Sequence, residues 1–325
     1  MNSTRRIAIT IVATTLLSIA LASSALAQSS GPIQVIVPYA PGGSADILGR
    51  LFSDLLGKQI NRPVLVVNQP GAGGELGTIN VSKAKPDGNT LLFQAPAVTI
   101  VQTLRKNPTF DVRRDLVPIA LTVESSMGFY VNPEVPVHNI RELITYAKAN
   151  PGKLNYASSG MGSSAHLYTE LFKTSAGVDI VHIPYSGGSA FSSSVVKNEA
   201  QVLIADSLGS PRPQAAAGRL RMLAVGSAAR SPAFPDVPTV SESGLPGYEV
   251  SYWLGFFAPP GTPADIVEKL NASIMTILKT PAVRDRLVGQ GYAVIASSSA
   301  DFKTFIAKEV AKWEKLVRDA NIPKD

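Results

Sequence analysis

The chain has 325 residues, of which 45% are hydrophobic and 17% charged, and its formal net charge is +6. This composition is typical of a globular protein of about two domains, at about 150 residues per domain, and it excludes a disordered or collagen-like chain. Cysteine is absent, which excludes disulfide scaffolds, thiolate zinc sites, a cysteine nucleophile and a lipoprotein anchor. The scattered lysines and arginines form no basic stripe, so no nucleic-acid partner is expected.

Residues 1–27 have the features of a secretory signal peptide. Arg5 and Arg6 precede an apolar stretch from Ile7 to about Ala22, and residues 25–27 form an A-x-A cleavage site. We therefore expect a periplasmic mature protein. A retained membrane anchor is the alternative, and the choice between Sec and twin-Arg export stays open. No later segment reaches the roughly 18 uninterrupted apolar residues of a membrane span.

The first part of the mature chain alternates strand and helix patterns. Predicted strands are the continuous apolar runs 33–37, 64–67 and 90–93. Apolar residues from Ile47 to Leu56 follow helical spacing and stop near Gly57, and a second helix is expected between the Gly-rich turn 70–74 and about Lys85. This order, β-α-β-α-β, predicts a parallel sheet covered by helices.

The same alternation restarts in the middle of the chain. Predicted strands are 154–157, 178–184, 201–205 and 220–225. Predicted helices are 165 to about 174, the segment from the 186–189 loop to 198, and a short one near 213–217. Continuous rather than alternating apolar runs are typical of buried parallel strands, so a second parallel-sheet unit is expected.

After Trp253 the pattern becomes helical. Thr262, Pro263 and Asp265 predict a helix start with Thr262 as N-cap, and Ser298 with Asp301 repeats the capping-box spacing. These helices need a sheet to cover, and the first unit is the natural candidate.

Two loops, each following a predicted strand and opening a helix, are candidate anion sites: residues 41–46 and 158–164. Unpaired N–H groups and the positive end of the helix dipole attract anions at such places. If both loops face one cleft between two lobes, Tyr185 and Asp206 are expected to line it as well, because each directly follows a predicted strand. Because these loops contain no Lys or Arg, a carboxylate held by neutral donors and waters is expected rather than a phosphate. A merely tight strand-to-helix connection is the alternative.

Other chemistries find little support in the sequence. The glycines of residues 70–77 have the wrong spacing for a dinucleotide fingerprint, and no P-loop is present. No G-x-S-x-G elbow accompanies Ser163, Ser164 and His166, so we expect no enzyme, no cofactor and no metal. A periplasmic serine hydrolase acting on a carboxylate ester and an orphan periplasmic sensor or interaction protein remain the alternatives.

Five separated motifs resemble the Bug family, the extracytoplasmic solute receptors of tripartite tricarboxylate transporters. They are residues 37–46, 67–74, 156–167, 234–239 and 258–263. The resemblance covers essentially all of residues 31 to 320. It departs from the family pattern after Gly188, where Ser189 and Ala190 stand in place of the usual Pro-Ala, and this leaves the identity of the ligand open.

The resemblance implies an α/β, two-lobed periplasmic-binding-protein (Venus-flytrap) fold of type II-like architecture, each lobe a mainly parallel sheet flanked by helices. Lobe 1 would comprise residues 28–126 plus 252–325, and lobe 2 residues 127–251. The implied ligand is a small organic mono- or dicarboxylate, aliphatic or aromatic. The implied partners are permease subunits of a tripartite tricarboxylate transporter or a sensor kinase, and a monomer is expected.

The expected ligand-binding residues come from both lobes. Lobe 1 would contribute Tyr39, Ala40, Gly42, Gly43, Ser44, Asp46, Gln94 and Ala97. Lobe 2 would contribute Ser158, Gly160, Ser163, Ser164, His166, Tyr185 and Asp206. Most of these positions follow from the resemblance, whereas Tyr39 and Tyr185 are chosen as aromatic residues at the mouths of the loops.

Overall fold

The computed structural model describes residues 31–185, 190–205, 208, 211–231, 234–319 and 324. The chain divides into two units, Met1–Pro32 and Ile33–Asp325. The predicted signal peptide, the loop 186–189 and Asp206 lie outside the described residues. Among the residues that are described, no helix combines the length and apolar character needed to span a membrane.

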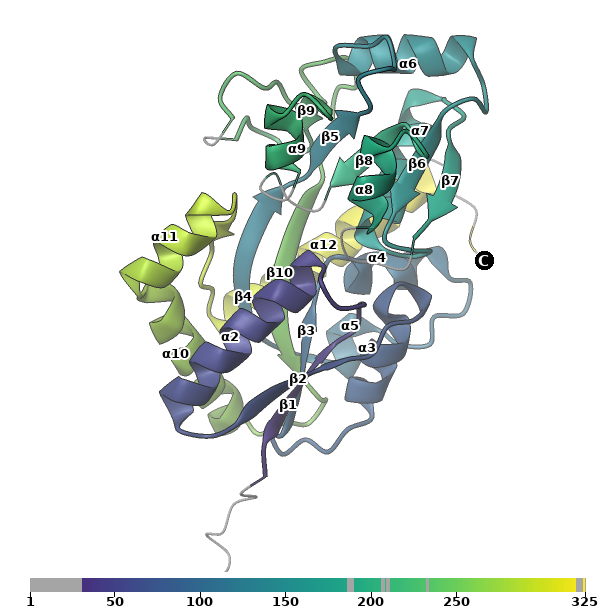
Figure 1. Ribbon diagram of the computed structural model, residues 1–325. Helices are drawn as coiled ribbons and strands as arrows, with labels where there is room; N and C mark the ends of the chain where they lie inside the picture. Colours follow the sequence, from purple (N-terminus) through teal and green to yellow (C-terminus); the bar gives the residue numbers. More distant parts are fainter. Residues whose placement is uncertain are drawn as a thin grey trace, which may run out of the picture. The chain divides into compact units, whose positions relative to one another are not determined.

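A six-stranded sheet in the order β11-β4-β10-β3-β1-β2 forms the first lobe (Figure 1). Its strands are β1 (Ile33–Val37), β2 (Val64–Asn68), β3 (Thr90–Gln94), β4 (Val117–Ser126), β10 (Ser251–Ala258) and β11 (Ala293–Val294). β1 pairs in parallel with β2 and β3, whereas β10 runs antiparallel to both β3 and β4, and β11 antiparallel to β4.

A five-stranded sheet in the order β7-β6-β8-β5-β9 forms the second lobe. Its strands are β5 (Gly128–Val131), β6 (Asn155–Ser158), β7 (Val181–Pro184), β8 (Val202–Ala205) and β9 (Arg221–Val225). β6 pairs in parallel with β7 and β8, and β5 is antiparallel to β8 and β9.

The predicted α/β two-lobed class is confirmed, but both sheets are mixed rather than mainly parallel. The difference arises where the chain passes between the sheets. β4 of the first sheet leads almost directly into β5 of the second, and β10 brings the chain back. β5 and β10 enter their sheets from the other lobe without a helical crossover, and both run antiparallel to their neighbours. Parallel neighbours need such a crossover, as in the β-α-β units.

Helices flank both sheets. They are α2 (Ser44–Ile60), α3 (Glu75–Ser82), α4 (Ala97–Leu104), α5 (Val112–Asp115), α6 (Ile140–Ala149), α7 (Ser164–Ala176), α8 (Ala190–Val196), α9 (Arg212–Ala216), α10 (Ala264–Lys279), α11 (Pro281–Gly289) and α12 (Ser299–Asp319), with the 3-10 turn η1 (Ala72–Gly74). As predicted, C-terminal helices cover the first sheet, since α10 and α12 both pack on β4. Ile274 of α10 is buried, and so is Trp313 of α12, whose ring stacks on Tyr168 of α7 with 5.5 Å between the ring centroids.

The two predicted capping boxes have different outcomes. At α12, the N–H of Asp301 donates to Ser298 Oγ at 3.0 Å, and Ser298 Oγ donates to the Asp301 carboxylate at 2.6 Å, as predicted. The prediction that Thr262 caps α10 is wrong. Its hydroxyl donates to the carbonyl oxygen of Pro259 at 2.8 Å, because Thr262 closes the preceding turn, and α10 begins at Ala264 without a side-chain cap.

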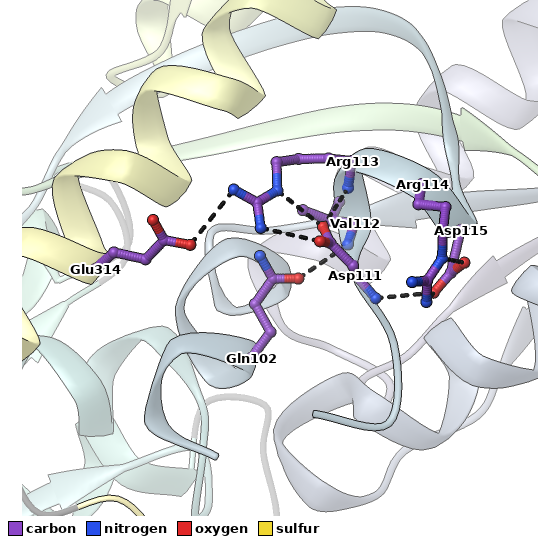
Figure 2. Close-up of polar contacts among 7 residues, drawn as sticks. All are labelled: Gln102, Asp111, Val112, Arg113, Arg114, Asp115 and Glu314. Carbon is purple, nitrogen blue, oxygen red and sulfur yellow. Dashed lines mark hydrogen bonds and ion pairs between the residues drawn. The ribbon is translucent and has the colours of Figure 1, made fainter. Parts of the chain in front are cut away.

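A network of polar contacts fixes the short helix α5 between α4 and α12 (Figure 2). The Asp111 carboxylate accepts hydrogen bonds from the backbone N–H and the guanidinium of Arg113, and that guanidinium also lies 3.4 Å from the Glu314 carboxylate of α12. Gln102 of α4 accepts from the N–H of Val112 at 2.9 Å. The arginines of this region therefore have carboxylate partners within the protein.

Candidate functional site

A cavity of about 660 Å³ lies between the loops of the two sheets. This volume falls in the range of about 300–1,000 Å³ that is usual for small-molecule pockets. Its wall comes from two turns and the elements around them. We call residues 39–46, between β1 and α2, the first turn, and residues 158–166, between β6 and α7, the second turn.

The first turn is held in place by the side chain of Asp46. Its carboxylate accepts hydrogen bonds from the N–H of Gly42 at 3.0 Å and from Asn68 Nδ2 at 2.9 Å, and it pairs with Arg50 at 2.9 Å. Asn68 Nδ2 also donates to the carbonyl oxygen of Tyr39. Burial on its own would raise the pKa of Asp46, but the hydrogen bonds from Arg50, Gly42 and Asn68 outweigh it and lower the pKa below its usual value. Asp46 is therefore a buried carboxylate that shapes the turn from behind.

A second network holds the aromatic side of the first turn. The Tyr39 hydroxyl donates to Gln94 Oε1, and Gln94 Nε2 donates to Thr78 Oγ1 at 2.8 Å. The Thr78 hydroxyl donates in turn to the carbonyl oxygen of Gly74, which lies in the pocket wall. Gln94 and Ala97 are each 1% exposed. The structure thus places Gln94 behind Tyr39 as a support, and Ala97 within the core.

In the second turn, several N–H groups form hydrogen bonds within the turn itself. Gly160 N–H donates to Ser158 Oγ at 3.1 Å, and Ser163 N–H donates to the Gly160 carbonyl at 3.2 Å. Gly162 N–H donates to Nδ1 of His166 at 3.2 Å, and the Ser163 hydroxyl caps α7 by accepting from the His166 N–H. Since Nδ1 acts as an acceptor, His166 is neutral in this arrangement.

An aromatic and ionic cluster supports the second turn. The ring of His182 lies 4.4 Å from the His166 ring and 4.6 Å from the Tyr156 ring, measured between centroids. The Tyr156 hydroxyl donates to Glu170 at 2.6 Å, and Lys173 pairs with Glu170 at 2.8 Å. Burial lowers the pKa of His166, and burial together with the neighbouring His166 lowers the pKa of His182 to about 4.

Unpaired donors remain where the two turns enter their helices. In the described residues, the N–H groups of Gly43, Ser44 and Ala45 at the start of α2 have no hydrogen-bond partner outside the helix, and neither do those of Ser164 and Ala165 at the start of α7. Such groups carry the positive end of the helix dipole. The pocket therefore meets two helix N-termini, one from each lobe.

The lobes touch at one edge of the pocket. A Cβ atom built on Gly73 of η1 would lie 2.4 Å from the carbonyl carbon of Gly162, and both residues have positive φ, +66° and +77°. Only glycine allows two backbones to approach this closely in that conformation. The Gly73–Gly162 contact joins the wall of the first lobe to the second turn.

The structure brings nine of the predicted site residues to the pocket wall: Tyr39, Ala40, Gly42, Gly43, Ser44, Gly160, Ser163, Ser164 and Tyr185. Five lie behind the wall as supports or core: Asp46, Gln94, Ala97, Ser158 and His166. Asp206 lies outside the described residues. Because its N–H is bonded to Asp46, Gly42 contributes space rather than a hydrogen-bond donor.

Several wall residues escaped the sequence analysis: Ile47, Leu48, Met161, Phe191, Arg212, Tyr252, Gln290 and Tyr292. Ile47 and Leu48 belong to the apolar stripe from Ile47 to Leu56, whose helical spacing indicates core. Arg212 changes the expected chemistry, because the strand-end loops contain no basic residue but the short helix α9 contributes one to the same pocket. No group of His, Asp and Glu in the described residues is arranged to hold a metal ion.

The sequence and the fold match those of known receptors. A family model described as the tripartite tricarboxylate transporter family receptor matches residues 48–322. The chain is 35% identical over 323 residues to protein BugT of Bordetella pertussis, covering 98% of each chain. It superposes on an R. palustris protein solved with adipate with a TM-score of 0.84, at 31% identity, covering 91% of this chain and 99% of that one.

A second solved structure, MatC from Rhodopseudomonas palustris with bound malate, gives a TM-score of 0.83 at 30% identity, covering 88% of this chain and 98% of that one. The family match spans most of the chain and agrees with the two-lobed fold and with the pocket between two strand-to-helix turns. The chain therefore belongs to the tripartite tricarboxylate transporter receptor family, together with the Bug proteins.

Proposed function

We propose that this protein is a periplasmic solute-binding receptor that captures a small organic carboxylate in the pocket between its lobes. The observation that carries the proposal is the convergence at one pocket of two helix N-termini, whose unpaired N–H groups include those of Gly43, Ser44, Ala45 and Ser164. A carboxylate satisfies several such donors at once and interacts favourably with both helix dipoles. The described wall contains no Asp or Glu that would repel it.

The ligand class is supported by the solved relatives. The R. palustris protein and MatC hold adipate and malate, both small carboxylates. The hydroxyl groups of Ser44 and Ser164, which also line the pocket, add neutral donors of the kind expected from the sequence. A small carboxylate therefore fits both the donor set and the family.

Closure of the lobes is the proposed mechanism. We assign residues 28–126 and 252–325 to lobe 1 and residues 127–251 to lobe 2, so that the chain crosses between the lobes near β4–β5 and before β10. A ligand shifts the equilibrium toward closure only if it binds the closed form more tightly. The Gly73–Gly162 contact is the place where backbone meets backbone when the pocket shuts.

The proposed receptor is not an enzyme. A serine–histidine pair is present, since Ser158 Oγ and His182 Nε2 lie 2.7 Å apart, but Ser158 is fully buried and no substrate reaches it. The Ser163 hydroxyl accepts the backbone N–H of His166 and has no contact with its ring nitrogens. Neither pair has the geometry of an activated nucleophile facing a pocket.

The biological setting follows the family. Residues 1–27 act as the export signal, and the mature receptor works in the periplasm as a monomer. It delivers its ligand to membrane permease subunits of a tripartite tricarboxylate transporter, or reports it to a sensor kinase.

A thermal-shift panel of carboxylates tests the proposal, with sulfate, phosphate, a sugar and a nucleotide as controls. Free ligand at about 100 times its Kd should add about 2.7 kcal/mol of stability to a protein that binds it only when folded. At least one carboxylate should raise the midpoint. A rise with the sugar or nucleotide and with no carboxylate would contradict the proposal. Turnover of a carboxylate ester that is lost in Ser158→Ala would favour the hydrolase instead.

A further inference from the structure

Arg212 is the one charged residue in the described wall of the pocket. The other residues of that wall are glycine, alanine, serine, proline, aliphatic and aromatic residues and one glutamine. An uncompensated cation beside a mostly apolar cleft attracts anions, because no carboxylate in the described wall neutralises its charge.

The contacts of Arg212 differ from those of other arginines in the structure. Arg113 pairs with Asp111 and Glu314, and Arg114 pairs with Asp115 (Figure 2). Arg212 forms no ion pair within the described part of the chain. Its guanidinium lies instead over the ring of Phe234, with 5.3 Å between the guanidinium carbon and the ring centroid.

Packing on an aromatic ring prepares the guanidinium for a ligand. The ring attracts the cation and restricts its orientation, but it occupies a face of the guanidinium and leaves the N–H edge available. A carboxylate can then accept two parallel hydrogen bonds at that edge. Phe234 belongs to the motif 234–239, which is fixed to β9 through the Val225–Thr239 bridge.

Arg212 lies on an element that carries neither helix N-terminus used by the first carboxylate. It begins α9 in the second lobe, whereas those donors belong to α2 and α7. Most of the remaining wall is apolar or aromatic and includes Leu48, Phe191 and Tyr252. The pocket thus offers two separate anion-binding groups and an apolar surface for the body of the ligand.

We propose that Arg212 binds the second carboxylate of a dicarboxylate whose first carboxylate lies at the two turns. The protein is then a receptor for dicarboxylates with an apolar aliphatic or aromatic body, and Arg212 determines its selectivity against monocarboxylates. This inference rests on the proposed function, because it assigns the ligand class of the same pocket.

Matched ligand pairs test the inference by titration calorimetry on the mature protein. Adipate is compared with hexanoate, and terephthalate with 4-methylbenzoate, so that each pair differs in one carboxylate. In at least one pair the dicarboxylate should bind about tenfold more tightly or better, as expected for a charge-assisted bidentate contact. Arg212→Met should lower that dicarboxylate affinity by about the same factor and leave the monocarboxylate within about twofold.

Arg219→Met is the matched control, since it removes the same charge from an exposed position of the same segment that does not line the pocket. It should leave both affinities unchanged. Phe234→Leu tests the positioning role of the ring and should reduce the ratio of dicarboxylate to monocarboxylate affinity. Melting curves without ligand should be alike for the variants, because Arg212 is exposed.

The possible results separate this inference from the proposed function. If monocarboxylates bind as tightly as their partners, or if Arg212→Met weakens both members of a pair equally, the role of Arg212 is wrong while the carboxylate receptor stands. An equal loss in Arg219→Met would also overturn it, because general charge would then explain the effect. If no carboxylate of the panel binds, both proposals fall.

Discussion

The two turns that face the pocket share one backbone plan but are held by opposite chemistry. In each, a strand ends, glycines turn the chain and a helix begins with unpaired N–H groups. The first turn is fixed by the Asp46 carboxylate and its three donors, whereas the second is fixed by the neutral imidazole of His166. A buried carboxylate with a lowered pKa stays charged above pH 5, while imidazoles titrate below neutrality. One wall of the pocket is therefore insensitive to pH and the other is not.

The largest expected effect on carboxylate affinity comes from a change at the Gly73–Gly162 contact between the two lobes. Gly73→Ala puts a methyl group 2.4 Å from the Gly162 backbone, so the two backbones must move apart at this contact. Overpacking of about 1–3 kcal/mol corresponds to a loss of about 5- to 150-fold in carboxylate affinity, measured by titration calorimetry.

Gly177→Ala is the control for this variant. Gly177 also has positive φ, +62°, but no atom lies within 4 Å of the position of the added Cβ, and it does not line the pocket. Both substitutions should cost about 1–2 kcal/mol of stability from backbone strain, and only Gly73→Ala should have the large additional effect on affinity. Equal affinities in the two variants would show that the close contact is not needed for binding.

The next largest effect is expected from a change in the Asp46 carboxylate, which holds the first turn in place. Asp46→Asn removes the charge that Arg50 and the N–H of Gly42 bind, and it leaves one neutral acceptor. Loss of a charge-assisted hydrogen bond should lower the free energy of unfolding by about 1.5 kcal/mol, measured by urea denaturation without ligand. Asp54→Asn on the same helix is the control, because the Asp54–Lys58 pair is exposed and should contribute little. Similar losses in both variants would contradict the special role of Asp46.

The second turn should respond to pH between about 6.5 and 4. The pKa values of His166 and His182 are lowered in the folded protein, so the unfolded chain takes up protons first as the pH falls below about 6.5. Stability is then lost progressively toward pH 4. Protonation of His166 Nδ1 also removes the acceptor of the Gly162 N–H, so ligand binding should weaken several-fold as the pH falls through the lowered pKa of His166.

The charged and titratable groups that surround His166 and His182 are Tyr156, Glu170 and Lys173. Asp46 makes no contribution in the same range, because a lowered carboxyl pKa loses its stabilisation only below about pH 4. His166→Asn keeps an acceptor without a titratable group and should flatten the dependence of affinity on pH. An unchanged pH profile in this variant would assign the effect to other groups.

The smallest effect is expected from the two tyrosines at the turns. Tyr39→Phe deletes the hydroxyl that donates to Gln94 and should cost about 0.5–1.5 kcal/mol in thermal unfolding. Tyr185→Phe, at the end of β7, serves as the comparison, because no hydrogen bond of its hydroxyl is found in the described residues and little change in stability is expected. A larger loss of thermal stability in Tyr185→Phe than in Tyr39→Phe would contradict the stabilising role of the Tyr39 hydroxyl.

Local sequence patterns predicted helices and strands well wherever the apolar residues followed a single helical or strand period. The apolar stripe from Ile47 to Leu56 gave α2, and the capping box at Ser298 gave the start of α12. Thr262 misled because the same residue types that cap a helix also close a tight turn. The central strands β4 and β10 have no helical crossover between them and the opposite lobe, so no local signal revealed that they run antiparallel to their neighbours.

The site was predicted only in part, for a related reason. Glycines and serines after a strand mark a turn that can bind an anion, and Gly43, Ser44, Ser163 and Ser164 do line the pocket. The sequence pattern did not separate wall residues from the groups behind them. Asp46 and His166 have the chemistry of ligand contacts, but their hydrogen bonds are used inside the protein.

By itself the sequence determined the α/β alternation, the two Gly- and Ser-rich strand-to-helix turns and the family, because these depend on residues close together along the chain. Only the tertiary structure decided which turns share a pocket, which polar groups are already satisfied, and that Arg212 joins the wall from an unrelated segment. Contacts between distant segments are set by how the sheets and helices pack, and packing leaves no period or motif in the local sequence.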